Sequence, residues 1–235
     1  MKLALVLSCE HGGNRVPAAY AHLFASKAAA DALAGHRGQD IGALALAKSL
    51  QDRFAVTLFG YTFTRLLVDL NRSIGHSGLY SEFSHDLDAP ARERLLARYY
   101  LPHRDRVTNA IGALVASDQR VLHVAVHSFT PRLGAHTRTV DIGLLYDPAR
   151  RGERAFCVRW QGALREAGTE LRVRRNYPYR GTADGFTTYL RRRFSSSAYM
   201  GIELEVNQSL LGRRPRETAG VIAQSLARAG GMASR

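Results

Sequence analysis

The sequence predicts an α/β fold with a mixed, mainly parallel twisted sheet that is flanked by helices on both faces. Short apolar runs of strand length alternate along the chain with longer segments whose apolar residues recur at helical spacing. The hydrophobic fraction of 46% and the charged fraction of 23% are those of a globular protein with a substantial core. No repeat or low-complexity linker divides the 235 residues, so we expect a single domain over 1–235.

The first predicted strand covers residues 3–9, LALVLSC, which form a short apolar run. This run is too brief for a signal peptide, and Glu10 follows it at once. A helix is predicted over 39–52, where IGALALAKSL has apolar residues at helical spacing. The polar, Gly- and Ser-rich segment 73–88 predicts a surface loop that could cover a site. The other strands are expected at 55–60, 65–70, 120–128, 140–146, 170–175 and 199–206, and the other helices at 90–116, 150–168, 184–193 and 214–229.

The net charge of +13 is large and would suit a nucleic acid, a membrane surface or a small anionic ligand. The arginines are spread along the chain and no nucleic-acid-reading motif accompanies them, so a nucleic-acid partner is not expected. No stretch approaches the ~20 apolar residues that span a bilayer, so no membrane association is expected either. Cys9 and Cys157 are too few for a disulfide framework, which together with the missing targeting signals favours the cytoplasm.

Polar side chains recur at the points where the predicted strands end. Because the carboxyl ends of parallel strands share one edge of a sheet, residues far apart in the sequence are expected to converge there. This pattern predicts a functional site at that edge. The residues are Glu10, His11, Asn71, Arg72, His127 and Glu205.

Two histidines and one carboxylate form a common zinc-binding set that leaves a fourth position for water. His11 and His127 suit this role because each follows a predicted buried strand. The carboxylate is either Asp40, where a helix is expected to begin, or Glu10, which adjoins His11; an acid in a first helical turn would also account for Asp40. His123 lies in the middle of a predicted strand, so we interpret it as a core imidazole.

The segment DLNRS places an amide and a guanidinium side by side, and Asn71 and Arg72 are therefore suited to hold a carboxylate. Arg65 could stabilise an oxyanion. Glu205 lies in an apolar strand, where partial desolvation raises the pKa of a carboxyl group and suits it to general-base catalysis. Glu203 has the same strand parity, so spacing alone does not separate the two glutamates.

Six motifs together resemble those of the N-formylglutamate amidohydrolase family, in the same order, over about residues 4–211. The resemblance implies a fold like that of zinc carboxypeptidases and aspartoacylases, with one zinc ion per chain. It departs from those branches at Asn14, where their HxxE motif has glutamate, and at Gln39, where many relatives have an aromatic residue. The motifs are SCEHGGNRVP, HRGQDIGA, TRLLVDLNRS, HSFTP followed by DIGLLYDP, NYPYRG with DGFT, and GIELEVNQSL.

The resemblance also implies a role for individual residues. His11 and His127 match zinc ligands, and Asp40 matches the acid of the family's DIGA motif, which implies the third ligand. Glu205 matches the acid of the EVN motif, which implies the general base. The Asn-Arg pair of DLNRS, at 71–72, matches residues that grip the α-carboxylate of the substrate.

Arg65 matches the family's upstream arginine approximately, since the spacing here is one residue shorter, and it would offset charge on the tetrahedral intermediate. A further arginine, Arg138, is expected to meet the side-chain carboxylate. The expected activity is hydrolysis of a small anionic N-acyl amino acid, most simply N-formyl-L-glutamate to formate and L-glutamate. The alternatives are a related deacylase or carboxypeptidase acting on another acidic amide, such as a peptidoglycan fragment, and a non-catalytic basic binding protein with the same fold.

Overall fold

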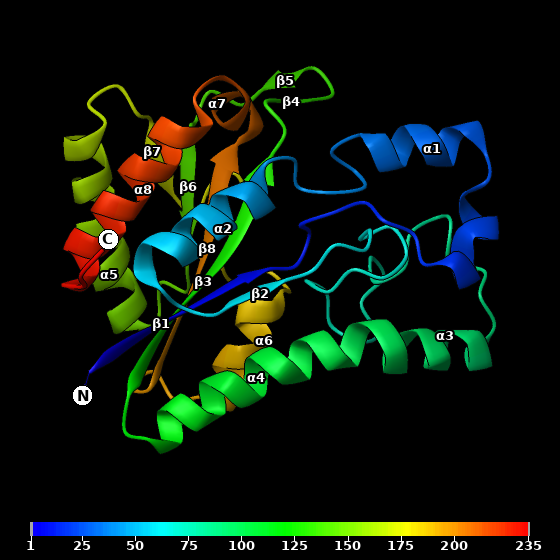
Figure 1. Ribbon diagram of the computed structural model, residues 1–235, viewed down its shortest axis with the longest axis horizontal. Helices are drawn as coiled ribbons and strands as arrows, with labels where there is room; N and C mark the ends of the chain where they lie inside the picture. Colours follow the sequence, from blue (N-terminus) through cyan, green and yellow to red (C-terminus); the bar gives the residue numbers. More distant parts are fainter. Residues whose placement is uncertain (1, 235) are drawn as a thin grey trace.

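The computed structural model describes residues 2–234 and confirms the α/β fold with a mixed, mainly parallel sheet (Figure 1). Six strands form the sheet in the order β2-β1-β3-β8-β6-β7. All neighbouring strands are parallel except β8 and β6, which are antiparallel. The strands are β1 Leu3–Cys9, β2 Leu58–Gly60, β3 Arg120–Phe129, β6 Ile142–Leu145, β7 Val173–Arg175 and β8 Tyr199–Asn207.

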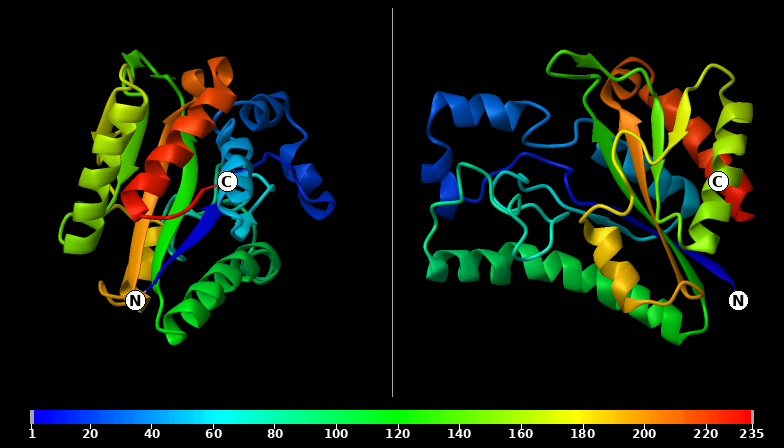
Figure 2. Two further views of the ribbon diagram at one scale, coloured as in Figure 1. Left: turned by 60° about the vertical axis from the view of Figure 1, so that its left-hand side comes forward. Right: turned by 180° about the vertical axis from the view of Figure 1, so that it is seen from behind.

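Helices cover both faces of this sheet (Figures 1 and 2). Helices α2, α5 and α8 pack on one face around the largest apolar cluster, and α4 and α6 pack on the other. The helices are α1 Lys27–Ala34, α2 Ala43–Phe54, α3 Ala89–Leu95, α4 Leu101–Ala116, α5 Arg151–Ala167, α6 Phe186–Arg193, α7 Gln208–Arg213 and α8 Pro215–Gly230, with a 3₁₀ helix η1 at Ala18–Phe24 and a π turn η2 at Leu96–Tyr100.

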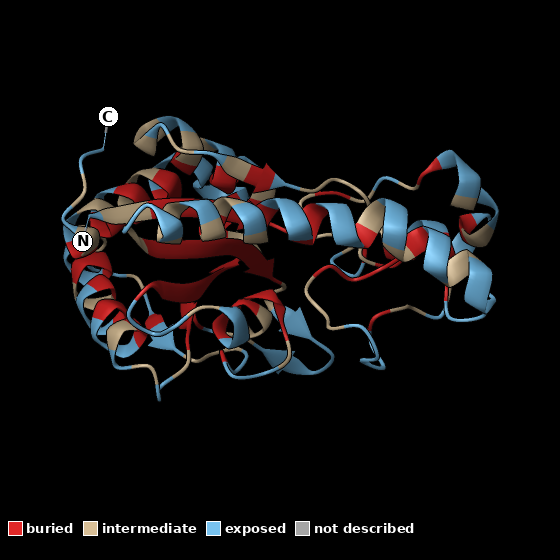
Figure 3. Ribbon diagram, turned by 90° about the horizontal axis from the view of Figure 1, so that it is seen from below, coloured by how far each residue is buried: buried red, intermediate tan, exposed pale blue. Residues whose placement is uncertain are grey.

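The central strands β1, β3 and β8 are almost entirely buried, as expected for parallel strands covered on both faces (Figure 3). Helix α2 shows how local sequence sets the layers. It begins after Gly42, whose φ of 84° favours glycine, and it buries Ala43, Leu46 and Leu50 against the sheet. Both cysteines are buried free thiols. Within residues 2–234 no helix has the length and apolar character needed to cross a membrane.

A lobe extends beyond the edge of the sheet, formed by η1, α1, α3 and residues 61–88 (Figures 2 and 3). It has its own apolar cluster, which includes Phe24, Leu67 and Leu95. The predicted surface loop 73–88 lies in this lobe and is partly buried, because Leu79 packs into the cluster.

The predicted strand at 65–70 is wrong. This segment is a series of turns, in which the amide of Leu67 donates to the carbonyl of Thr64 and the amide of Arg72 donates to that of Asp69. Leu66, Leu67 and Val68 are buried in the apolar cluster of the lobe rather than by a sheet. The predicted helix at 90–116 consists of α3, η2 and α4 in succession. The sequence did not indicate η1, α1, α7 or the hairpin of β4 Arg132–Leu133 and β5 His136–Thr137.

His123 lies in the core, as predicted, where its ring nitrogens contact the hydroxyls of Ser8 and Tyr199, each at 2.8 Å. Burial lowers the pKa of His123 from 6.5 to about 4. Between these values the unfolded chain binds a proton that the folded protein does not, so stability is lost as the pH falls through this window. As the pH falls from about 7.5 to about 5, we expect protonation of this histidine in the unfolded chain to lower the free energy of unfolding by about 2 kcal/mol.

Urea unfolding at both pH values, for the wild type and His123→Gln, measures this contribution. The variant should be less stable at neutral pH and should show a shallower decline toward acid. An equal decline in both proteins would contradict the assignment.

Candidate metal and substrate site

Three strands bring the predicted residues to one edge of the sheet, as the parallel topology requires. His11 follows β1, His127 lies near the end of β3, and Glu205 lies directly opposite His127 in the register of β3 and β8. A cavity of about 250 Å³ opens at this edge. Seven of the eight predicted residues line it, namely His11, Asp40, Arg65, Asn71, Arg72, His127 and Glu205.

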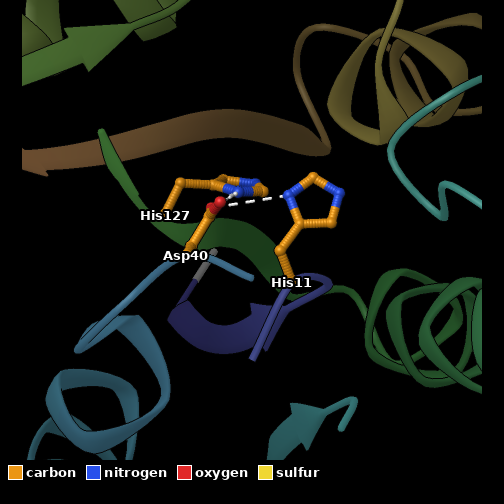
Figure 4. Close-up of side chains that lie close together, drawn as sticks. All are labelled: His11, Asp40 and His127. Atoms are coloured by element: carbon orange, nitrogen blue, oxygen red, sulfur yellow. Dashed lines mark hydrogen bonds and ion pairs between the residues drawn. The ribbon is translucent and has the colours of Figure 1, made fainter. Parts of the chain in front are cut away.

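His11, Asp40 and His127 all line the cavity and form a compact group (Figure 4). Oδ2 of Asp40 lies 2.9 Å from Nδ1 of His127 and 3.4 Å from Nδ1 of His11. One donor atom from each residue lies within 4.8 Å of the others, so the group could hold a metal ion. Of the two carboxylates left open by the sequence, Asp40 belongs to this group and Glu10 does not.

The outer nitrogens of both imidazoles face carboxylates. Nε2 of His11 lies 2.7 Å from Oδ1 of Asp69, and Nε2 of His127 lies 3.4 Å from Oε2 of Glu10. The close contact with Asp69 favours the proton on Nε2 of His11 and leaves the lone pair of its Nδ1 for a metal, as is usual for metal-ligating histidines. Nδ1 of His11 is buried without a hydrogen-bond partner within residues 2–234. Two nitrogens and one carboxylate oxygen therefore fit zinc.

The side chains of this group shift one another's pKa values. Burial alone would raise the pKa of Asp40, but the adjacent His11 and His127 outweigh it and lower the pKa, so the carboxylate is ionised. Burial and Arg65 act to lower the pKa of His11, whereas Asp69 and Asp40 raise it and prevail. The group therefore pairs an anionic oxygen with imidazoles whose protons a metal must displace.

Tertiary contacts aim Asp40 at the histidines. Its amide donates to the carbonyl of His11 at 2.9 Å, and its own carbonyl accepts from Ala43, the first residue of α2. Asp69, which the sequence analysis missed, contacts His11 and also accepts a 2.6 Å hydrogen bond from Arg65. Arg65 additionally lies 3.5 Å from Asp40. An acid within the apolar stretch LLVDL was the signal that could have identified Asp69.

The segment that contains Asn71 and Arg72 is tied to the loop before α6. Oδ1 of Asn71 accepts a hydrogen bond from the amide of Phe186 at 2.6 Å, which leaves the amide nitrogen for a ligand. Arg72 donates to the backbone carbonyls of Asp184 and Asn71. The carboxylate of Asp184 in turn accepts hydrogen bonds from Ser73. The guanidinium of Arg72 is thereby fixed at the wall of the cavity.

The structure distinguishes Glu205 from Glu203. Oε2 of Glu205 is buried and accepts no hydrogen bond from the part of the chain that the structure describes. Burial is the largest cause that raises the pKa of Glu205 to about 8. Glu203 lies two residues earlier, opposite Ala125, and accepts a 2.7 Å hydrogen bond from Thr187. Glu205 is therefore the glutamate that lies opposite His127 and has a buried carboxyl oxygen without a hydrogen-bond partner among the described residues.

A family model of N-formylglutamate amidohydrolase matches residues 3–211. The chain belongs to the N-formylglutamate amidohydrolase family. The gene product Atu2144 of Agrobacterium tumefaciens has a similar crystal structure, with a TM-score of 0.82, 31% identity, and coverage of 96% of this chain and 89% of that chain. A crystal structure of N-formylglutamate amidohydrolase from Ralstonia eutropha JMP134 shares the fold, with a TM-score of 0.68, 19% identity, and coverage of 97% and 92%. No curated protein matches the sequence.

In this N-formylglutamate amidohydrolase family member, Arg138 does not line the cavity. Its guanidinium lies over the ring of Tyr179 at 5.2 Å and donates to the hydroxyl of that residue at 3.2 Å. Tyr179 and Arg180 do line the cavity, from the loop between β7 and α6. The side chain of Asn176 fixes this loop by accepting hydrogen bonds from the amides of Tyr146 and Gly181. The sequence contained these residues in NYPYRG but gave no sign that they face the site.

Proposed function

We propose that the protein is a zinc-dependent amidohydrolase that cleaves N-formyl-L-glutamate to formate and L-glutamate. The observation that carries this proposal is the juxtaposition of the His11, Asp40 and His127 group with the buried carboxylate of Glu205. Membership of a family of amidohydrolases supports the reaction class. The expected cytoplasmic location and the single domain over 1–235 remain predictions.

His11 and His127 would hold zinc through Nδ1, and Asp40 through Oδ2. When bound, zinc supplies Lewis acidity, which polarises a carbonyl and lowers the pKa of water. Glu205 accepts the proton of the attacking water and delivers it to the leaving nitrogen, a role that its raised pKa suits. Formyl transfer to water then releases formate and the free amine.

Two arginines would stabilise negative charge in the cavity. Asp69 orients Arg65 through a 2.6 Å contact, so its guanidinium is placed to offset charge that develops on the carbonyl oxygen. Arg72 is held through backbone carbonyls rather than a carboxylate, and it is therefore suited to a bidentate contact with the α-carboxylate of the substrate. The amide nitrogen of Asn71 adds a donor to the same carboxylate.

The experiment that tests this proposal combines elemental analysis with a hydrolysis assay. We expect about one zinc per chain in the wild type, as in mononuclear catalytic sites, and loss of zinc in His11→Ala and His127→Ala. Formate should be released from N-formyl-L-glutamate in preference to N-acetyl and peptide amides of acidic amino acids. A folded wild type that binds no zinc when zinc is supplied would contradict the metal site. Zinc binding with preference for another acidic amide would indicate the related deacylase or carboxypeptidase instead.

The second carboxylate of the substrate offers a test of specificity. Arg138 was expected to bind it, yet Arg180 is the arginine that lines the cavity from this side. We expect Arg180→Gln to lower kcat/KM for N-formylglutamate by about 10–100-fold, the range for a lost charge-assisted hydrogen bond. Activity toward N-formylglutamine should not change, because that substrate lacks the side-chain charge.

Arg138→Gln is the matched control for this specificity, and we expect a smaller effect because Arg138 contacts Tyr179 rather than the cavity. Steady-state kinetics measure the ratio of kcat/KM for N-formylglutamate to kcat/KM for N-formylglutamine in each variant. Loss of discrimination in the Arg138 variant alone would restore Arg138 as the residue that meets the second carboxylate.

A further inference from the structure

Behind His127 lies a buried glutamate that the proposed mechanism does not use. Glu10 directly follows β1 and is 0% exposed. Its carboxylate lies between two imidazoles, with Oε2 at 3.4 Å from Nε2 of His127 and Oε1 at 3.6 Å from Nε2 of His103. His103 is also buried and comes from α4, on the face of the sheet that carries α6. The three side chains therefore form a line from α4 to the metal group.

Among the ion pairs formed within residues 2–234, the carboxylate of Glu10 takes part only in these two. Neither of its oxygens accepts a hydrogen bond from residues 2–234. A buried carboxylate in that setting is destabilising unless nearby cations or donors offset it. The carboxyl group of Glu10 therefore faces the outer nitrogens of both histidines.

Aromatic packing fixes the far end of this line. The ring of His103 lies 5.4 Å from the ring of Tyr61 and 6.3 Å from that of Phe186. The next residue, Arg104, packs over Phe186 at 4.4 Å and donates to the carbonyl of Leu70. His103 therefore has little freedom to turn away from Glu10.

We propose that Glu10, held in place by His103, positions His127 for metal binding by keeping the ring proton on Nε2 and presenting Nδ1 to the cavity. Asp69 occupies the corresponding position beside His11, at 2.7 Å. Glu10 and His103 are positioning residues, since neither lines the cavity. This inference rests on the proposed zinc site.

Zinc affinity, measured by competition with a chromophoric chelator, tests the role of Glu10. Glu10→Ala should weaken zinc binding by about 10–100-fold, the usual effect of removing the partner of a ligating histidine. Glu10→Gln should have a smaller effect, because its amide oxygen can still face Nε2 of His127 but carries no charge.

His123→Gln is the matched control, because His123 is a buried histidine on the same strand that contacts Ser8 and Tyr199 instead of the metal group. It should lower stability and leave zinc affinity unchanged. A merely structural role for Glu10 predicts that the variants at both positions change zinc affinity in parallel with their stability.

The contribution of His103 is tested by a pair of variants. His103→Phe keeps ring packing against Tyr61 and Phe186 but removes the nitrogen that faces Glu10, so zinc affinity should fall. His103→Gln keeps a donor toward Glu10 and should restore part of the affinity. Equal zinc affinity in the phenylalanine variant and the wild type would remove His103 from the proposal.

The outcomes separate this inference from the proposed function. A wild type that binds no zinc contradicts the metal site itself, and the positioning role fails with it. A wild type that binds zinc, with unchanged affinity in both Glu10 variants, overturns the positioning role alone. If those variants do not fold, ¹⁵N NMR of histidine-labelled, zinc-loaded wild type decides the matter. A proton on Nε2 of His127 supports the proposal, and its absence there overturns it.

Discussion

Replacement of Glu205 by glutamine is expected to lower kcat by about 10²–10⁴-fold, the range for loss of a general base, while the protein stays folded and retains zinc. Glutamine has the same size but does not accept a proton at neutral pH. Glu205 lies opposite His127, and its Oε2 is buried without a donor within the described residues. Formate release under saturating N-formylglutamate, with zinc content measured on the same sample, checks this result.

Glu203→Gln is the natural comparison, since Glu203 also lines the cavity but is engaged by Thr187. Its kcat should stay close to that of the wild type. Near-wild-type turnover in the Glu205 variant, with loss of turnover in the Glu203 variant, would exchange the roles of the two residues.

Asp40→Asn is expected to reduce zinc affinity strongly. Loss of a residue that only contacts a ligating histidine lowers affinity by about 10–100-fold, and loss of the Asp40 ligand should have a larger effect. Oδ2 of Asp40 is the point at which both imidazoles meet, and this carboxylate supplies the negative charge of the group. The variant also removes the charge of one of the two carboxylates that face the guanidinium of Arg65. Chelator competition gives the affinity, and elemental analysis gives the stoichiometry.

The comparison for Asp40 is Asp69→Asn, which changes the outer partner of His11 and should remain within the smaller range. Unchanged zinc affinity in Asp40→Asn would bring back Glu10 as the third ligand, the alternative that the sequence alone left open.

The fold was largely predictable because buried parallel strands are continuous apolar runs, as in β1, β3 and β8. The exception is residues 65–70, where Leu66, Leu67 and Val68 are buried by the lobe and not by a sheet. Periodicity does not reveal which partner buries a short apolar run, and this ambiguity also hid Asp69. The π turn between α3 and α4 has no signature in the apolar pattern.

The positions of the candidate site residues were predictable where the strand order alone determines them. His11, His127 and Glu205 come from the ends of neighbouring strands, so the strand order brings them together. The choice between Asp40 and Glu10 depends instead on the backbone after β1. Gly13 packs so closely on residue Thr62 that a Cβ atom would lie 2.4 Å from its carbonyl oxygen. That tertiary contact helps to set the path of the chain between Glu10 and the cavity, and no local sequence pattern encodes it.

Arg65 contacts both Asp40 and Asp69, and those carboxylates also contact His11. When a ligand's oxygen attracts the guanidinium of Arg65, that guanidinium neutralises less of the charge on Asp40 and Asp69. The two carboxylates then attract a metal ion more strongly. Zinc and a substrate-like ligand should therefore act as heterotropic effectors of one another. By thermodynamic linkage, the factor by which zinc tightens such a ligand equals the factor by which the ligand tightens zinc. Resistance to chelators should accordingly increase when the cavity is filled.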